Sequence, residues 1–370
     1  MRILSFDWAT KKALTVYDSQ NDKTKEIPNS IPEFEKFLKT IKEKTIMLFE
    51  FGGGETFKLL AFRAGHTIIQ IPGKKIRDYR VEHGIEKTDL KDAKTIYDFF
   101  INNNGGSIMA SVRKSTICVS SSTQSKKGAS VGHNVNDSNL RVPLPFYLFK
   151  EQNADIAKLK ILFREYEDLK KEMVREKLKK IALERRFQIA CVGSDQIKKI
   201  TKEKDISISA KEKQVKELKK ILKKKIEQFD IWNQYYKNMK GAGATIIAGF
   251  IAELGGRYFE NDASLKHFCG MLTKYTKKKG HYHPTKNPDG GYSDIQRSIK
   301  QSLFQFTEQI ILKRTPKWRE LYDNIKIYYA EKHPDWTKKK IDNYAKKFVQ
   351  TRLIIDFWQR WKETDISVRL

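Results

Sequence analysis

Cysteines are scarce in this 370-residue chain, and long apolar segments are missing. The three cysteines, Cys118, Cys191 and Cys269, are far apart, which argues against both a disulfide framework and a cysteine zinc site. Their scarcity fits a reducing cytoplasm. No uninterrupted apolar run approaches the roughly 18 residues of a membrane span, so we expect no membrane partner. The opening MRILSFDWA starts a strand pattern and lacks the layout of a secretory signal peptide.

Acidic residues are also outnumbered. The chain has 45 Asp and Glu against 73 Lys and Arg, which gives a net charge of +28. This excess makes nucleic acid the leading partner, although a lysine-rich proteome would raise the count too. Apolar residues make up 39% and charged residues 32%. The chain is therefore too polar for one large globule, and its length predicts two or three domains.

The first hundred residues alternate between strand and helix patterns. Short apolar runs predict five strands, over 3–8, 12–19, 24–28, 45–50 and 66–72. Apolar spacings of three and four residues predict helices over 31–44 and 55–65, in the basic stretch after residue 72, and from Asp89 onward. Three strands, helix, strand, helix, strand, helix is the element order of a ribonuclease H-like α/β domain, which we place at residues 1–102.

The rest of the chain divides into three segments. Residues 103–150 are rich in Gly, Ser and Asn, which indicates a flexible linker or an insert that orders on nucleic acid. Residues 151–239 predict an antiparallel coiled-coil hairpin, interrupted at 191–196, whose apolar stripe is a self-packing or dimer seam. Residues 240–370 predict a helical domain with its tryptophans in the core. The expected fold class is therefore α/β plus all-α.

Four acids carry the clearest chemical signal. Asp7 and Glu50 each close a short apolar strand, and Asp89 and Asp92 have the spacing that puts both on one helix face. A buried carboxylate is costly unless it is paired or binds metal. Together the four would form an oxygen-rich cage for two Mg²⁺ or Mn²⁺ ions, which suits hydrolysis of a phosphodiester. The alternative is that Asp89 or Asp92 only caps its helix.

Three glycines, Gly52 to Gly54, directly follow the strand that ends at Glu50. No Gly-Lys-Ser/Thr follows them, so they are not a P-loop. The phosphate loops of a sugar-kinase or actin-type ATPase are also missing. We expect the glycines to let nucleic acid or a neighbouring strand approach Glu50 closely.

A second candidate site is basic and lies nearer the C-terminus. The stretch KKKGHYHP at 277–284 combines lysines, which bind phosphates, with His and Tyr rings, which stack on unpaired bases. Its two histidines without a nearby cysteine are poor evidence for zinc. A solvated surface loop is the alternative. The candidate RNA-binding residues are Lys274, Lys277, Lys278, Lys279, His281, Tyr282, His283, Lys286, Arg297 and Lys300.

Several segments resemble known families. SFDWA, FEFGGGETFKLLAFRAGHTIIQIP and EKTDLKDAKTI resemble the RuvC-like DEDD domain of RNA-bridged insertion-sequence transposases. GAGATIIAGFIAELGGRYFENDASLKHFCGM resembles their C-terminal domain and the Nop domain of box C/D ribonucleoprotein core proteins. The transposases carry a nucleophilic serine shortly afterwards, but LTKYTKKKGHYHPTK has none, and Thr273 and Thr276 are poor substitutes. The chain is therefore similar to the RuvC-bearing Tas proteins of the TIGR systems (the TasR form).

This resemblance implies an RNA-guided, metal-dependent DNA endonuclease in the cytoplasm of a prokaryote or in a phage-infected cell. The coiled coil and a Nop-like domain at 240–370 would hold a guide RNA with box C- and box D-like elements, within a homodimer. The guide would pair with double-stranded target DNA, and the four acids, with two Mg²⁺ or Mn²⁺ ions per site, would cut it. Two alternatives stay open: a transposase or recombinase with a displaced hydroxyl nucleophile, and a non-catalytic RNA scaffold.

Overall fold

The structure is a computed structural model in which the chain forms two compact units, Met1–Ala154 and Asp155–Arg369. The described residues are 2–8, 13–51, 53–105, 146–190, 193–257, 259, 261–271, 273–276, 281–284 and 297–364. Side chains are described for these residues except at positions 89, 90, 104, 105, 273–276, 281–284 and 297.

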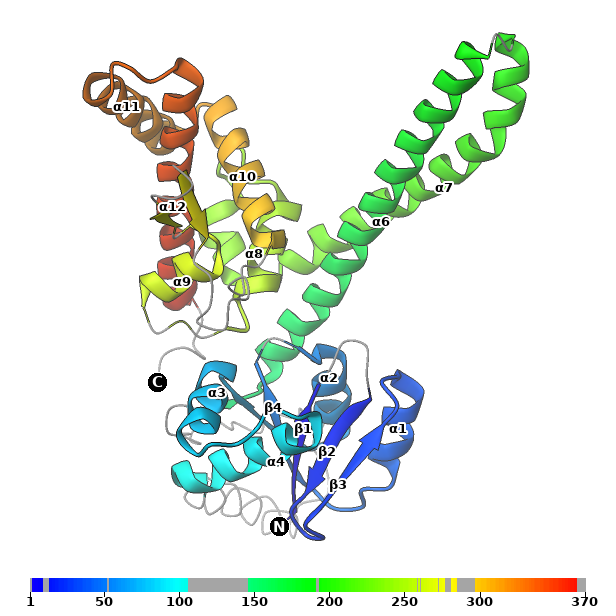
Figure 1. Ribbon diagram of the computed structural model, residues 1–370, viewed down its shortest axis with the longest axis vertical. Coiled ribbons are helices and arrows are strands. Elements are labelled where there is room, and N and C mark those ends of the chain that lie inside the picture. Colours follow the sequence, from blue (N-terminus) through cyan, green and yellow to red (C-terminus); the bar gives the residue numbers. More distant parts are fainter. Residues whose placement is uncertain are drawn as a thin grey trace, which may run out of the picture. The chain divides into compact units, whose positions relative to one another are not determined.

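A six-stranded mixed sheet lies at the centre of the N-terminal unit (Figure 1), in the order β3-β2-β1-β4-β5-β6. β1, β4 and β5 are parallel, whereas β2, β3 and β6 run antiparallel to their neighbours. The strands are β1 (Ile3–Asp7), β2 (Leu14–Asp18), β3 (Lys23–Ile27), β4 (Ile46–Glu50), β5 (Thr67–Ile71) and β6 (Tyr147–Leu148). The helices are α1 (Ile31–Lys39), α2 (Glu55–Arg63), α3 (Gly73–Glu82), α4 (Asp89–Phe100) and the π-helical turn η1 (Ile101–Gly105).

Aromatic rings join α1 and α2 to one face of this sheet. Phe6 of β1 and Phe49 of β4 stack with their ring centroids 4.5 Å apart. Phe34 of α1 meets Phe6 edge to face at 6.0 Å and Phe57 of α2 at 4.8 Å. Such edge-to-face and offset contacts add stability beyond the burial of the rings. The even-numbered positions of β1 therefore form the core under α1 and α2.

The opposite face packs against α3 and α4. Its apolar cluster combines strand residues with residues of both helices: Ile3, Ile46, Leu48, Ile69, Ile71, Ile76, Tyr79, Ile96, Phe99 and Phe100. Within it the buried hydroxyl of Ser5 donates a hydrogen bond of 2.7 Å to the carbonyl oxygen of Ala93. This bond fixes the first turns of α4 against β1, on the face toward which the odd-numbered residues of β1 point.

The five predicted strands and the helices of the N-terminal unit are present, but some bounds differ. The helix expected over 31–44 ends at Lys39, because the amide of Thr40 donates to the carbonyl of Phe37 in a tight final turn. The sequence pattern did not predict β6. It pairs with β5 through Gln70 and Tyr147, and Phe146 beside it is buried. Residues expected to be linker thus complete the sheet, and the unit extends past 102 to Ala154.

Two long helices, α6 (Glu151–Ile189) and α7 (Ser194–Ile226), form the predicted antiparallel hairpin. Figure 1 shows them side by side. Ion pairs join them, with Lys177 2.7 Å from Glu212 and Lys211 3.1 Å from Glu172. The chain reverses between Ile189 and Ser194, where the sequence pattern breaks. Exposed pairs of this kind contribute little stability each.

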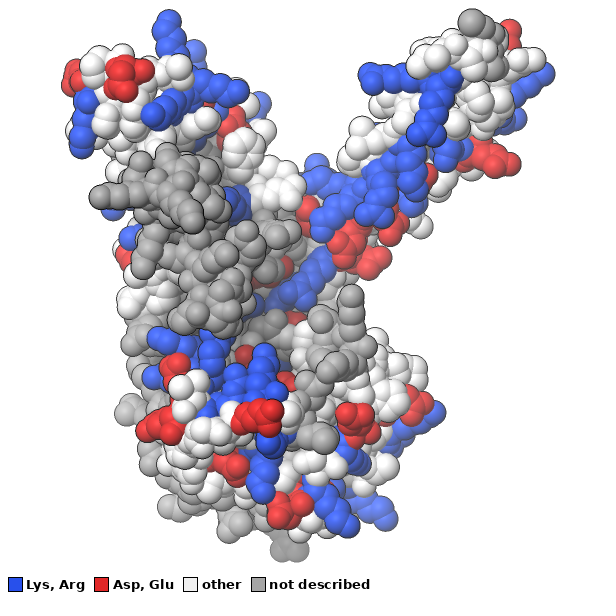
Figure 2. Space-filling view, viewed as in Figure 1, with Lys and Arg blue, Asp and Glu red and all other residues white. Residues whose placement is uncertain are grey.

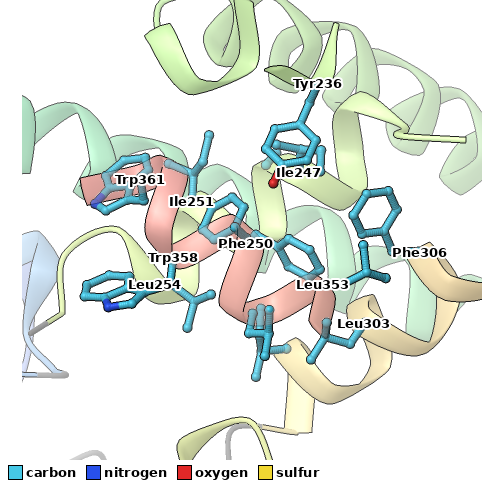
Figure 3. Packing of buried hydrophobic residues seen from close by; sticks show 14 of the residues in the cluster. Tyr236, Ile247, Phe250, Ile251, Leu254, Leu303, Phe306, Leu353, Trp358 and Trp361 are labelled. Atoms are coloured by element: carbon cyan, nitrogen blue, oxygen red, sulfur yellow. The ribbon is translucent and has the colours of Figure 1, made fainter. Parts of the chain in front are cut away.

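The remainder of the C-terminal unit is a helical core (Figure 3). Trp318, Trp358 and Trp361 are buried in it, as expected. Trp336 is only partly buried and stacks on His333 with 3.9 Å between ring centroids, at the connection between two helices. The elements are η2 (Trp232–Tyr236), α8 (Ala244–Leu254), α9 (Asp262–Phe268), β7 (Thr273–Thr276), β8 (His281–Pro284), α10 (Arg297–Leu312), α11 (Pro316–Lys332) and α12 (Lys338–Thr364).

The chain thus combines a mixed α/β unit with a mainly helical one, as the expected fold class states. In the part of the chain that the structure describes, no helix has both the length and the apolar composition needed to cross a membrane.

Candidate functional site

Asp7 and Glu50 lie at the same step of two neighbouring parallel strands. Phe6 of β1 is in register with Phe49 of β4. The next residues, Asp7 and Glu50, therefore lie side by side where the two strands end. Adjacent strands are about 4.8 Å apart. Ser5 and Leu48, two residues earlier, point to the face covered by α3 and α4. Because side chains alternate, both acids extend toward the same face.

The first turn of α4 brings Asp92 to this strand edge. Thr88 caps the helix, with its hydroxyl accepting a hydrogen bond of 3.2 Å from the amide of Lys91. Neither Asp89 nor Asp92 is therefore the cap. Asp92 is buried, with 8% of its surface exposed. Asp89 is the first residue of α4, and its side chain lies outside the described set.

Electrostatic coupling supports this arrangement. Part of the Glu50 side chain reaches solvent, yet protein atoms surround its carboxyl group, and this desolvation is the main cause of its raised pKa. The negative charge of Asp7 raises the pKa of Glu50 further, and Asp92 adds a smaller effect in the same direction. The positive charges of Lys58 and Arg77 oppose them. Glu50 therefore shares one electrostatic environment with both aspartates.

An arginine of α3 is paired with the third acid. Nη1 of Arg80 donates a hydrogen bond of 2.8 Å to Oδ1 of Asp92. The two side chains are only 15% and 12% exposed, so the pair is largely shielded from water. A carboxylate and a guanidinium in such a place compensate each other's loss of hydration. Asp92 is thus held in position by α3 as well as by its own helix.

A buried lysine fixes the end of β4 from the opposite face of the sheet. Lys58 of α2 is 1% exposed. Its ammonium group donates to the backbone carbonyl of Glu50 at 2.9 Å and to the side-chain oxygen of Gln70 at 3.2 Å. A buried ammonium is costly unless its donors are satisfied. Lys58 therefore links α2, β4 and β5 directly beneath the acid pair.

Glycines make room on both sides of the site. A Cβ atom at Gly53 would lie 2.5 Å from Cε3 of Trp8, so this glycine accommodates an indole ring. The close approach to Glu50 comes from Gly73, the first residue of α3. A Cβ atom there would lie 1.7 Å from Oε1 of Glu50. Gly52 lies outside the described residues.

The donor chemistry suits a hard divalent cation, but the described side chains do not complete a cage. Among the described residues, no group of three or more His, Cys, Asp and Glu side chains is arranged to hold a metal ion. One oxygen of Asp92, Oδ1, accepts a hydrogen bond from Arg80, and Asp89 lies outside that comparison. Asp7 and Glu50 remain as two carboxylates whose repulsion a cation would relieve, since Mg²⁺ and Mn²⁺ prefer oxygen ligands.

Only part of the basic candidate site can be placed. Lys274 lies in β7 opposite His283 of β8, and Tyr282 lies opposite Tyr275. Their side chains, and that of Arg297 at the start of α10, are not described; residues 277–279 and 286 lie outside the described ranges. Lys300 is exposed on α10. Burial lowers the pKa of Lys347 on α12, and the positive charge of Lys300 lowers it further, as expected of two neighbouring cations.

Sequence reasoning missed four residues that shape the acid site: Lys58, Gly73, Arg77 and Arg80. The basic run KKIRDYR was a signal for the arginines, since cations beside clustered acids compensate their charge. No local signal identified Lys58 or Gly73, because a lysine is normally exposed and a glycine normally weakens a helix.

Comparison with known proteins adds nothing here: no protein-family model matches the chain, and no curated protein matches it significantly.

Proposed function

We propose that the N-terminal unit is a metal-dependent phosphodiester hydrolase. One observation carries the proposal: Asp7 and Glu50 end adjacent parallel strands side by side, and the charge of Asp7 raises the pKa of Glu50. Forcing two carboxylates together is unfavourable unless the site binds something positive. Asp92 and Asp89, in the first turns of α4, would complete the oxygen ligands.

The chain's own residues would do three things in such a reaction. Asp7, Glu50, Asp89 and Asp92 would hold two Mg²⁺ or Mn²⁺ ions, which when bound neutralise charge at a phosphate and lower the pKa of water. Lys58 and Gly73 would keep Glu50 in one position from opposite sides. Arg80 would orient Asp92. Holding ligands rigidly in this way is what makes a metal site effective.

For the whole chain we propose a more specific function, that of an RNA-guided DNA endonuclease. It is supported by the resemblance of the acidic segments and of residues 241–271 to the RuvC-bearing Tas proteins. The C-terminal unit, with Lys300, Lys347 and the β7–β8 strands, would hold a guide RNA with box C- and box D-like elements in a homodimer. Base pairing would then choose the double-stranded DNA target, while the protein would contact backbones.

The test of hydrolysis uses the purified full-length chain with Mn²⁺ and labelled DNA. We expect cleavage by the parent chain and none by Asp7→Asn, which keeps the side-chain shape and removes the charge. Asp22→Asn, an exposed acid at the β2–β3 turn, is the control. Equal cleavage by the parent and Asp7→Asn would overturn the site.

The test of guidance is sequencing of the RNA that co-purifies when the chain is expressed with its genomic neighbourhood. A uniform short RNA with box-like elements, together with cleavage of matching DNA, would support guidance. Heterogeneous RNA with unguided cleavage would refute guidance and leave the hydrolase. A covalent protein–DNA adduct would point to a recombinase instead, and RNA binding without any cleavage would point to a scaffold.

A further inference from the structure

Helix α3 connects the acids of the site to a basic surface. It begins with Gly73 against the carboxyl group of Glu50, and in its last turn Arg80 pairs with Asp92. Both ends of this helix are therefore anchored on acids of the candidate site. In the view of Figure 2, Lys and Arg side chains gather around α3, with acidic side chains next to them.

The charges of α3 are divided between its two halves. Successive helical residues are about 100° apart. Relative to Gly73, Arg80 lies within about 20°, Arg77 about 40° and Lys74 about 100° around the helix. Asp78, Glu82 and Lys75 are grouped about 140–200° away. The half of α3 that is centred on Arg77 thus carries only positive charge, whereas the other half carries both signs.

Two of these cations are positioned to meet a ligand. Lys74 and Arg77 are exposed. Arg77 lies four residues after Gly73, about one helical turn along α3 from the backbone that meets the carboxyl group of Glu50. One helical turn separates the two residues, a rise of about 4.5 Å. The flexible Lys side chain and the long Arg side chain can adjust from this spacing to neighbouring phosphates of one strand.

A strand approaching the site needs such cations. The clustered carboxylates repel each phosphate of a nucleic acid, and a bound cation would offset this only at the phosphate that reacts. The neighbouring phosphates require separate positive partners, which Lys and Arg supply. We propose that Lys74 and Arg77 bind the backbone phosphates of the DNA strand that enters the acid site. This proposal rests on the hydrolase function, because it assigns the path of that substrate.

The experiment measures equilibrium binding of fluorescein-labelled DNA to the full-length chain in EDTA, over a range of salt concentrations. The test variant is Lys74→Gln with Arg77→Gln. The matched control is Lys75→Gln with Lys39→Gln, which removes the same charge from the other half of α3 and from α1 on the other face of the sheet. Both pairs are exposed, so both variants should fold.

Each lost phosphate contact reduces the slope of log K against log salt by about 0.7 for a single strand or 0.9 for a duplex. In the test variant we expect the slope to fall by about twice this amount, because two contacts are lost. The affinity should fall roughly five- to eightfold per contact at 0.1 M salt. The control should keep the parent slope. Equal slopes for the test and control variants would overturn the proposal.

RNA of the same sequence is the second arm. A slope change for RNA without one for DNA would refute the assignment to the DNA strand. Because binding in EDTA requires no hydrolysis, the two proposals fail separately. If the parent chain never cleaves DNA but the test variant shows the reduced salt slope for DNA, the phosphate-binding role of α3 is kept and the hydrolase function is refuted. If the parent cleaves DNA but the salt slope of the test variant is unchanged, the hydrolase function is kept and the role of Lys74 and Arg77 is refuted.

Discussion

The carboxyl group of Glu50 packs directly on the backbone of Gly73, so closely that a Cβ atom at position 73 would lie 1.7 Å from Oε1. Glycine is required there by contact and not by backbone conformation. Gly73 begins α3 without a left-handed backbone angle, so the helix itself would accept alanine there. The position therefore separates an effect on the site from an effect on the fold.

Gly73→Ala should displace the Glu50 carboxyl group and leave the chain folded. We expect at least a tenfold loss of Mn²⁺-dependent cleavage, because a rise of about 1.4 kcal/mol in the activation free energy already lowers the rate tenfold. Thermal unfolding should change little. Gly193→Ala, where a Cβ atom meets nothing within 4 Å, is the control. Full activity in Gly73→Ala would show that the position of Glu50 is unimportant.

The buried ammonium of Lys58 should be important for stability. In Lys58→Met the carbonyl of Glu50 and the side-chain oxygen of Gln70 lose their donor, and an unsatisfied buried acceptor costs about 1–3 kcal/mol. Hydrogen exchange of β4 and α2 should therefore accelerate. Lys36→Met, exposed on α1, is the comparison. Unchanged exchange in Lys58→Met would contradict a structural role for this lysine.

Glu50 predicts a specific pH dependence of stability. Its folded-state pKa is raised by burial and by Asp7, so the folded chain binds a proton more tightly than the unfolded chain. Stability from this group is complete below the unfolded pKa near 4.5 and is lost as pH rises through the folded pKa. In EDTA, Glu50→Gln should therefore raise the melting temperature at pH 7, and the gain should disappear toward pH 4.

Glu26→Gln, on the exposed strand β3, controls for the loss of one negative charge from a chain with a net charge of +28. A gain in melting temperature for Glu50→Gln that is the same at pH 4 and pH 7 would show that ionisation of Glu50 is not its cause.

Arg80 and Asp92 should be energetically coupled. Their pair is largely shielded from water, so removal of either partner leaves a poorly hydrated charge. A double-mutant cycle with Arg80→Met and Asp92→Asn, followed by urea unfolding, should give a coupling free energy of about 1–2 kcal/mol. The exposed pair of Lys36 and Glu33 serves as the reference, where we expect below about 0.5 kcal/mol. Equal coupling in both pairs would contradict the burial argument.

Much of the fold followed from local patterns. The strands ending at Asp7 and Glu50, the helix beginning at Asp89 and the reversal between α6 and α7 were all predictable, because they depend on residue periodicity and on turn and capping signals within a few residues. The strand β6 was not predictable. Its two residues have no periodicity of their own and form a strand only because β5 offers an open edge.

The acid site was predictable as a set of residue types but not as an arrangement. The sequence placed carboxylates at the ends of two strands and in the first turn of a helix. It could not show that Asp92 pairs with Arg80, or that the glycines after β4 accommodate Trp8 while Gly73 meets Glu50. The candidate RNA-binding residues from Lys274 to Lys300 stay a prediction.

The sequence by itself determined most of the elements, the excess of positive charge and the four acids, since each of these is a property of neighbouring residues or of composition. Only the tertiary structure decided which of them meet. The hydrogen bond from Ser5 to Ala93 joins residues 88 positions apart and sets α4 on β1. Contacts of that range depend on how apolar faces pack against each other, and a periodic pattern identifies such a face without naming its partner.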